Sequence, residues 1–267
     1  MFAIDTHAHV FSINDPCIAT ARYQPDYDAS VSQYLAHLDQ HHLSHGVLVQ
    51  PSFFGFDNHV MLDAIAQHPK RLKGIAVVPY TITINELITL NNQGIVGARI
   101  NLFGKELPDL TSIEWKSFLN HLSFISWQIE LHAPPSYLVQ ILPYLAEYKL
   151  NVVIDHFGRI DPEKGILDPD YQSFLQMLDI NQHWIKVSGF YRLGKFPENV
   201  ARATHAFELL KAKGFLPKMV WGSDWPHTQH ESSVNYSQAF ETFKQIVTDP
   251  EDRKLILGGN AKNLFYF

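Results

Sequence analysis

Residues 151–159 read Asn-Val-Val-Ile-Asp-His-Phe-Gly-Arg, a short apolar run that ends abruptly in polar and charged residues. The run is rich in β-branched residues and shows no alternation of apolar with polar side chains, which is typical of a strand covered on both faces. Seven further runs of this kind lie at residues 2–5, 46–50, 72–78, 95–100, 127–131, 184–187 and 218–222. The chain is therefore predicted to contain eight buried strands, of which residues 151–155 form the sixth.

Segments with helical spacing of their apolar residues lie between these strands. They cover residues 31–43, 57–67, 112–124, 136–148, 171–178, 197–213 and 233–247. Strands that alternate with helices pair in parallel, and eight of them fit a closed (β/α)8 barrel of the TIM type better than an open sheet. Such a barrel takes about 250 residues, so residues 1–267 are predicted to form one barrel domain. The end of the chain, residues 250–267, carries a short apolar helical pattern and is expected to be a C-terminal extension.

The composition restricts the classes of partner. Lys and Arg number 21 and Asp and Glu number 27, which gives a formal net charge of −6, and no cluster of basic residues stands out. A nucleic-acid partner or an anionic membrane surface is therefore not expected. The single Cys17 excludes an intrachain disulfide and a cysteine metal cluster. Without a signal-peptide pattern or an apolar run of roughly 18 residues, the protein is expected to be cytoplasmic, as a monomer or small homo-oligomer.

Histidines and an acid follow three of the predicted strands. His7 and His9 come after the first strand, two residues apart, so their side chains project to the same face. His156 follows the sixth strand and Asp224 follows the eighth. Because the active sites of such barrels form at the carboxyl ends of the strands, we expect these four side chains to converge there. An isolated His-x-His is weak in a chain with 15 histidines, so the conjunction of all four carries the expectation.

The motifs around these residues resemble the amidohydrolase superfamily, in the branch that contains 2-pyrone-4,6-dicarboxylate lactonase and the sugar lactonases. The resemblance extends over nearly the whole chain. It rests on Asp5-Thr6-His7-Ala8-His9-Val10, Gly97-Ala98-Arg99-Ile100-Asn101, Ile154-Asp155-His156-Phe157-Gly158-Arg159, Lys186-Val187-Ser188-Gly189, Trp221-Gly222-Ser223-Asp224-Trp225-Pro226-His227 and Gly258-Gly259-Asn260-Ala261. These motifs are more specific for the branch than for the substrate.

The resemblance implies an enzyme that opens a carboxylated lactone similar to 2-pyrone-4,6-dicarboxylate. Asp224 would activate water as general base, while His7, His9 and His156 would contact the lactone carbonyl. The resemblance also implies a group of residues that bind the substrate. They are Arg99, Arg192, Lys105, Ser52, Tyr23 and His132. We expect burial beside Trp221 and Trp225 to raise the pKa of Asp224, which would make it a stronger base.

Two residues depart from the pattern of that lactonase. Lys105 replaces an arginine, and a lysine offers a point charge where arginine offers a bidentate fork. His132 replaces a tyrosine, and metal-dependent relatives have a histidine ligand on this strand. A divalent ion such as zinc or manganese would find five possible ligands here, namely His7, His9, His132, His156 and Asp224. We nevertheless expect that no cofactor is required, because the pyrone lactonase is metal-independent.

The sequence is also compatible with three alternatives. The first is a metal-dependent hydrolase or decarboxylase of the same superfamily, with His132 as a ligand. The second is a sugar-acid lactonase, in which Arg99 and Arg192 have structural or single-carboxylate roles. The third is a barrel that binds a small molecule without catalysis, although a binding protein has no need for a carboxylate opposed to three histidines.

Overall fold

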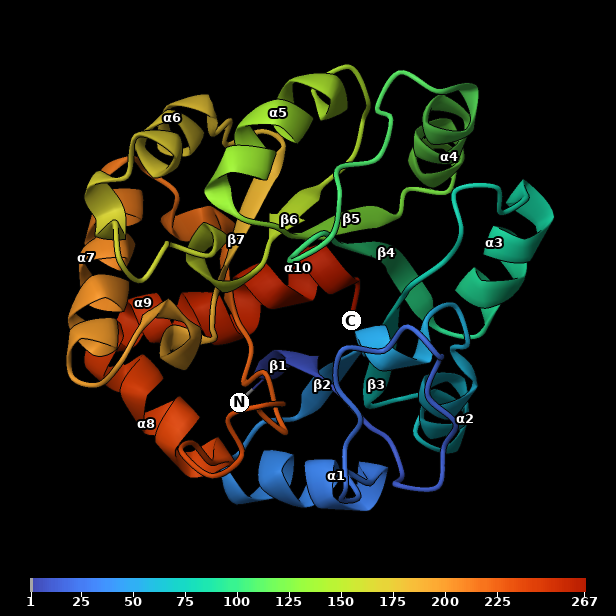
Figure 1. Ribbon diagram of the computed structural model, residues 1–267. Helices are drawn as coiled ribbons and strands as arrows, with labels where there is room; N and C mark the ends of the chain where they lie inside the picture. Colours follow the sequence, from blue (N-terminus) through green and yellow to red (C-terminus); the bar gives the residue numbers. More distant parts are fainter. Residues whose placement is uncertain (1) are drawn as a thin grey trace.

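The computed structural model describes residues 2–267 and contains eight parallel strands, each hydrogen-bonded to the next along the chain. They are β1 (Ile4–Ala8), β2 (His45–Val49), β3 (Leu72–Ala76), β4 (Ile95–Asn101), β5 (Gln128–His132), β6 (Val152–Ile154), β7 (His183–Val187) and β8 (Met219–Trp221). Figure 1 shows the strands surrounded by helices. The predicted (β/α)8 barrel is confirmed.

Ten α-helices accompany the strands within residues 2–267. They are α1 (Val31–Gln40), α2 (His59–Gln67), α3 (Ile84–Asn92), α4 (Ile113–Phe124), α5 (Pro135–Leu145), α6 (Pro169–Met177), α7 (Glu198–Ala212), α8 (Tyr236–Ile246), α9 (Pro250–Lys254) and α10 (Ala261–Phe265). Side-chain caps fix where several begin: Ser30 caps α1 and Asn235 caps α8, each in a reciprocal capping box. None of these helices combines the length and the apolar character that crossing a bilayer requires.

The seam between β1 and β8 brings the two ends of the strand series together. The amide of Asp224 donates to the carbonyl oxygen of His7 (2.8 Å), and the amide of His9 donates to that of Trp225 (2.7 Å). Behind the seam, the buried Asp5 carboxylate accepts from the amide and hydroxyl of Ser223 at 2.8 and 2.6 Å. The loop that carries Asp224 is therefore attached directly to the strand that carries the two histidines.

The helix α10 closes the opposite end of the barrel. Leu264 and Phe265 are buried against Ile4, Val153 and Trp184, which lie on three of the strands. In Figure 1 this helix lies across the centre of the ring of strands. The C-terminal extension thus completes the core at the end remote from the residues that follow the strands.

Candidate active site

A cavity of about 300 Å³ lies at the carboxyl ends of the strands. Its lining comes from the carboxyl ends of β4 and β5 and from the loops after β1, β2, β4, β6, β7 and β8, which is the arrangement expected for the functional end of a barrel. The lining residues are His9, Arg22, Tyr23, Pro51, Ser52, Phe53, Arg99, Asn101, Phe103, His132, His156, Arg159, Arg192, Asp224, Thr228, Gln229 and His230. Most of the predicted site residues therefore share one cavity.

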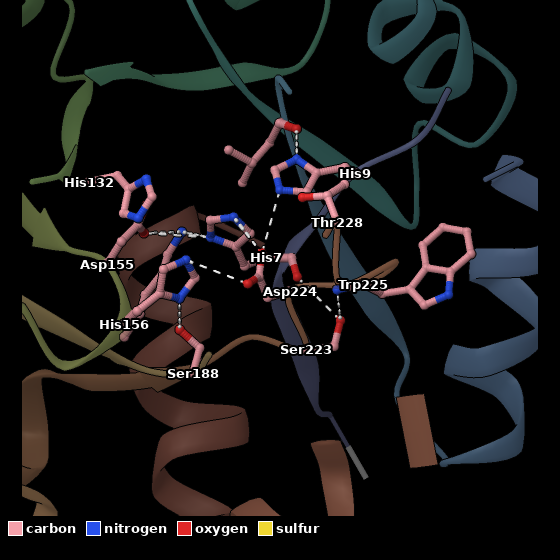
Figure 2. Close-up of polar contacts among 12 residues, drawn as sticks. His7, His9, His132, Asp155, His156, Ser188, Ser223, Asp224, Trp225 and Thr228 are labelled. Carbon is pink, nitrogen blue, oxygen red and sulfur yellow. Dashed lines mark hydrogen bonds and ion pairs between the residues drawn. The ribbon is translucent and has the colours of Figure 1, made fainter. Parts of the chain in front are cut away.

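The Asp224 carboxylate faces three imidazoles. Its Oδ1 lies 3.7 Å from Nε2 of His7 and 3.6 Å from Nε2 of His9, and its Oδ2 lies 3.7 Å from Nε2 of His156. Figure 2 shows the three rings pointing toward the acid. All four side chains are buried. The structure thus brings together the four residues that the strand ends predicted.

Two of these residues have left-handed backbone conformations. The φ angle is +60° at Asp224 and +51° at His156, in a region where residues other than glycine are uncommon. Gly189 packs against His156 so closely that a Cβ there would lie 2.7 Å from Nδ1 of the ring. Such conformations persist only where the surroundings enforce them, and they gather at functional sites.

The environment of Asp224 differs from the sequence-based expectation. Burial alone would raise the pKa of Asp224, but the Arg192 guanidinium and the His156 imidazole outweigh burial and hold the pKa well below its usual range. Nε of Arg192 and the hydroxyl of Tyr191 each donate to Oδ2 at 2.6 Å. The two tryptophans expected to form an apolar wall pack elsewhere: Trp225 stacks on Tyr34 and points away from the acid. Trp221 packs against Phe240 and Phe243. The expectation of a raised pKa is therefore wrong.

Two of the imidazoles around Asp224, those of His7 and His156, are held neutral. Burial lowers the pKa of His156 to about 3. Burial and, second, the Lys186 ammonium place the pKa of His7 well below its usual value. Nδ1 of His9 lies 2.7 Å from the carbonyl oxygen of Val49, to which it must donate, and its Nε2 faces Oδ1 of Asp224. Nδ1 of each ring thus has a different partner: Lys186 for His7, the Val49 carbonyl for His9 and the Ser188 hydroxyl for His156.

Four guanidinium groups line the cavity, those of Arg22, Arg99, Arg159 and Arg192. Arg99 donates from Nε and Nη2 to Oδ2 of Asp155 at 3.1 and 3.0 Å, so part of its charge is already compensated. Arg159 lies over the ring of Phe103 at 4.1 Å, and its buried Nε has no hydrogen-bond partner within residues 2–267. The cavity therefore offers several cationic groups to an anionic ligand, although the whole chain is acidic.

A family model described as amidohydrolase matches residues 4–267. The chain belongs to the amidohydrolase family. It is 60% identical, with a TM-score of 0.99 and full coverage of both chains, to the crystal structure of a probable 2-pyrone-4,6-dicarboxylic acid hydrolase from Acinetobacter baumannii with citric acid bound.

Two curated relatives point to the same branch. A 2-pyrone-4,6-dicarboxylate hydrolase from Comamonas testosteroni is 30% identical over 84% of this chain and 77% of its own length. A 4-sulfomuconolactone hydrolase from Hydrogenophaga intermedia is 25% identical over 98% of this chain and 88% of its own. The resemblance inferred from the motifs is thus confirmed.

The remaining predicted substrate-binding residues of this amidohydrolase occupy different places. Ser52, Tyr23 and His132 line the cavity. The hydroxyl of Tyr23 donates to Glu231, and Nδ1 of His132 lies 3.1 Å from Oδ1 of Asn101. Lys105 is exposed and does not line the cavity.

Sequence reasoning missed two of the cavity arginines. Arg159 ends the run that also contains Asp155 and His156, so its position in the motif was a usable signal. Arg22 lies in the long loop after β1, next to Tyr23. A loop of this length has no periodicity from which the direction of a side chain could be inferred.

The ligand atoms for a metal ion are close enough to one another in two overlapping groups. One group is His7, His9 and Asp224, and in each group the possible ligand atoms lie within 4.8 Å of one another. The second group is His7, Asp155 and His156. Such nitrogen and oxygen donors suit zinc.

The hydrogen bonds around these groups do not fit an ion bound to His7. A metal-bound histidine normally donates its second ring N–H to an acceptor, as His9 does to Val49. Nδ1 of His7 instead meets the Lys186 ammonium at 3.1 Å, which is a donor. Arg192 also competes for the Asp224 carboxylate. The absence of a required cofactor stays a prediction.

Proposed function

We propose that this amidohydrolase opens the ring of a carboxylated lactone, similar to 2-pyrone-4,6-dicarboxylate, with water activated by Asp224. The observation that carries the proposal is the carboxylate opposed to three imidazole nitrogens within 3.7 Å, in a cavity that four arginines line. Hydrolysis of a lactone needs a base for water, donors for the carbonyl oxygen and a proton for the leaving oxygen, and this set of groups supplies all three.

The proposed reaction follows from the positions of the side chains. Asp224 accepts a proton from water, and the water oxygen bonds to the lactone carbonyl carbon. N–H groups of His7 and His156 stabilise the oxyanion that forms; removing one such donor typically costs about 10²–10³ in rate. The ring C–O bond then breaks, and the proton held by Asp224 passes to the leaving oxygen. The product carries one more carboxylate than the substrate.

An anionic substrate is supported by the charges in the cavity. Charge-assisted contacts from guanidinium groups hold carboxylates in a defined orientation, and such positioning places a carbonyl over the attacking water. The net charge of −6 does not oppose binding, because salt screens distant surface charges over about 8–10 Å. The structure at 60% identity was solved with citric acid, a tricarboxylic acid. The two curated relatives are named for a dicarboxylate and a sulfonated lactone.

A panel of lactones tests the proposal. Purified protein should hydrolyse 2-pyrone-4,6-dicarboxylate or a muconolactone-type substrate much faster than an uncharged aldonolactone, measured by the loss of lactone absorbance or by acid release. Preference for aldonolactones would favour the sugar-acid alternative, and no hydrolysis of any member would contradict the proposal. Metal analysis of the active protein and assay after chelation test the expectation that no cofactor is required.

Asp224→Asn tests the proposed base on the same panel. The carboxamide keeps the size of the side chain but cannot accept the proton of water, so turnover should fall below detection. Circular dichroism and the thermal unfolding midpoint should show that the variant is folded. Near-normal hydrolysis by folded Asp224→Asn would show that another group activates water.

A further inference from the structure

A lysine lies inside the barrel, beneath the proposed catalytic residues. Lys186 on β7 is fully buried, and its Nζ donates to Oε2 of Glu130 at 2.7 Å. The same Nζ lies 3.4 Å from Oδ1 of Asp155 and 3.1 Å from Nδ1 of His7. Arg99 also donates to Asp155. The two buried cations, Lys186 and Arg99, are thus paired with the two buried acids Glu130 and Asp155, because an unpaired buried charge would be strongly destabilising. None of the steps of the proposed reaction involves Lys186 or Glu130.

The direction of the hydrogen bond between Lys186 and His7 follows from the chemistry of the two groups. An ammonium has three donors and no acceptor, so Nδ1 of His7 must accept. Oδ1 of Asp155 also lies near Nδ1, but at 3.5 Å it is the more distant group. A neutral imidazole that accepts at Nδ1 carries its proton on Nε2. That Nε2 faces Asp224, which lines the cavity, and has no hydrogen-bond partner within residues 2–267, although His7 itself is fully buried beneath the lining.

We propose that Lys186 is a positioning residue that keeps the proton of His7 on Nε2 and makes His7 a fixed donor to the substrate carbonyl. His9, two residues along, is held by the opposite kind of contact, since its Nδ1 donates to the carbonyl oxygen of Val49. The same proton on Nε2 of His7 disfavours a metal ion at this position. The effect on rate rests on the proposed lactone hydrolysis, whereas the location of the proton does not.

The location of the proton is measured on the wild-type protein. Long-range ¹H–¹⁵N spectra of protein labelled with ¹⁵N-histidine distinguish protonated from unprotonated ring nitrogens, and His7→Gln identifies the signals of His7. We expect Nε2 to be protonated and Nδ1 to be bare. The reverse pattern would overturn the proposal whatever the activity of the protein.

Variants then test the role of Lys186. In Lys186→Met, and in Lys186→Met/Glu130→Gln, which removes the acid left without its partner, the His7 signals should shift toward the other tautomer. We expect kcat to fall about 10–100-fold, as when an outer partner that orients a histidine is lost, with little change in KM. Added Zn²⁺ should be retained after dialysis by these variants more than by wild type.

A matched control removes another lysine from a barrel strand. Lys73 on β3 donates to the carbonyl oxygen of Tyr266 at the end of the chain, so Lys73→Met should leave the His7 spectrum, kcat and zinc retention unchanged. Wild-type His7 signals and kcat in either Lys186 variant would overturn the proposal. If neither variant folds, the wild-type spectrum decides. Absence of hydrolysis on every lactone would refute the proposed function but not the assigned position of the proton.

Discussion

The response of the protein to pH is set at individual residues around Asp224. Arg192 and the neighbouring imidazoles keep the pKa of Asp224 well below its usual range despite burial. The pKa of His156 is lowered to about 3, and that of His7 lies well below its usual value. Between about pH 5 and pH 8 the acid therefore stays ionised and both rings stay neutral.

The dependence of the rate on pH should reflect these charge states. Because none of these three groups changes charge in that range, kcat/KM for the preferred lactone should be nearly constant from about pH 5 to pH 8, and the acidic limb should appear below the usual pKa of an aspartate. Initial rates in overlapping buffers at constant ionic strength measure it. A midpoint near pH 6 or 7 would instead show that another group controls the reaction, such as Asp5 or Glu130, whose pKa values burial raises to about 6 and about 7.

The two arginines Arg192 and Arg159 should respond differently to substitution. Each charge-assisted contact is worth about 1.5–3 kcal/mol, so Arg159→Met should raise KM for a carboxylated lactone roughly 10–100-fold without moving the acidic limb. Arg192→Met removes the group that most lowers the pKa of Asp224, so it should raise KM and also move the acidic limb to higher pH. Identical pH profiles for the two variants would contradict the assigned role of Arg192.

At the scale of the elements, the approach of β8 to β1 depends on Gly222. A Cβ at this position would lie 2.4 Å from Cβ of His7 and 2.9 Å from its backbone nitrogen. No rotation of a side chain relieves a clash with backbone. The missing side chain therefore allows the loop that carries Asp224 to lie directly beside His7.

Gly222→Ala should lower both stability and activity. Overpacking typically costs about 1–3 kcal/mol, and displacement of β8 would move Asp224 away from the imidazoles. Urea unfolding and kcat measure the two effects. Gly259→Ala is the control, because its Cβ would meet only the end of the Leu255 side chain at 3.4 Å. Wild-type stability and rate in Gly222→Ala would show that a methyl group at residue 222 can be accommodated beside His7.

The strands were predictable from the sequence because burial on both faces leaves continuous apolar runs. Their positions hold, with ends that differ by a few residues, as in β6 at Val152–Ile154. The helix α3 was not predicted, because Leu87 is its only fully buried residue. Thr83 and Glu86 form its capping box, a local signal too short to establish a helix without an apolar stripe.

The convergence of His7, His9, His156 and Asp224 was predictable because the strand ends of a barrel meet at one rim. The ion pairs among these elements were not. Lys186 lies in a run read as apolar, and its partner Glu130 is 56 residues away on β5. The pairing of Arg192 with Asp224 likewise depends on how two loops fold back, and the sequence contains no periodicity that reports it.

The two ends of the whole barrel differ: one holds the candidate active site, and α10 covers the other. Phe265 on α10 is fully buried against the floor formed by the strands, whereas the cavity lies at the carboxyl ends of those strands. The two ends should therefore be separable by mutation.

Phe265→Ala should destabilise the protein by about 3–5 kcal/mol, the usual cost of removing a buried aromatic ring. Its kcat per folded molecule should match wild type at a temperature where the variant remains folded. Tyr266→Ala is the control, since Tyr266 is 56% exposed. Denaturant unfolding and single-substrate kinetics measure both quantities, and a large loss of kcat in folded Phe265→Ala would show that the two ends are coupled.

The seam between β1 and β8 also has a consequence for biosynthesis. Ser223 and His7, which the seam joins, are 216 residues apart, and contacts of such long range form late and slowly. Because a ribosome adds about 5–20 residues per second, about 10–40 s separate the synthesis of His7 from that of Asp224. A nascent chain therefore lacks the proposed catalytic acid until β8 and Asp224 have left the exit tunnel.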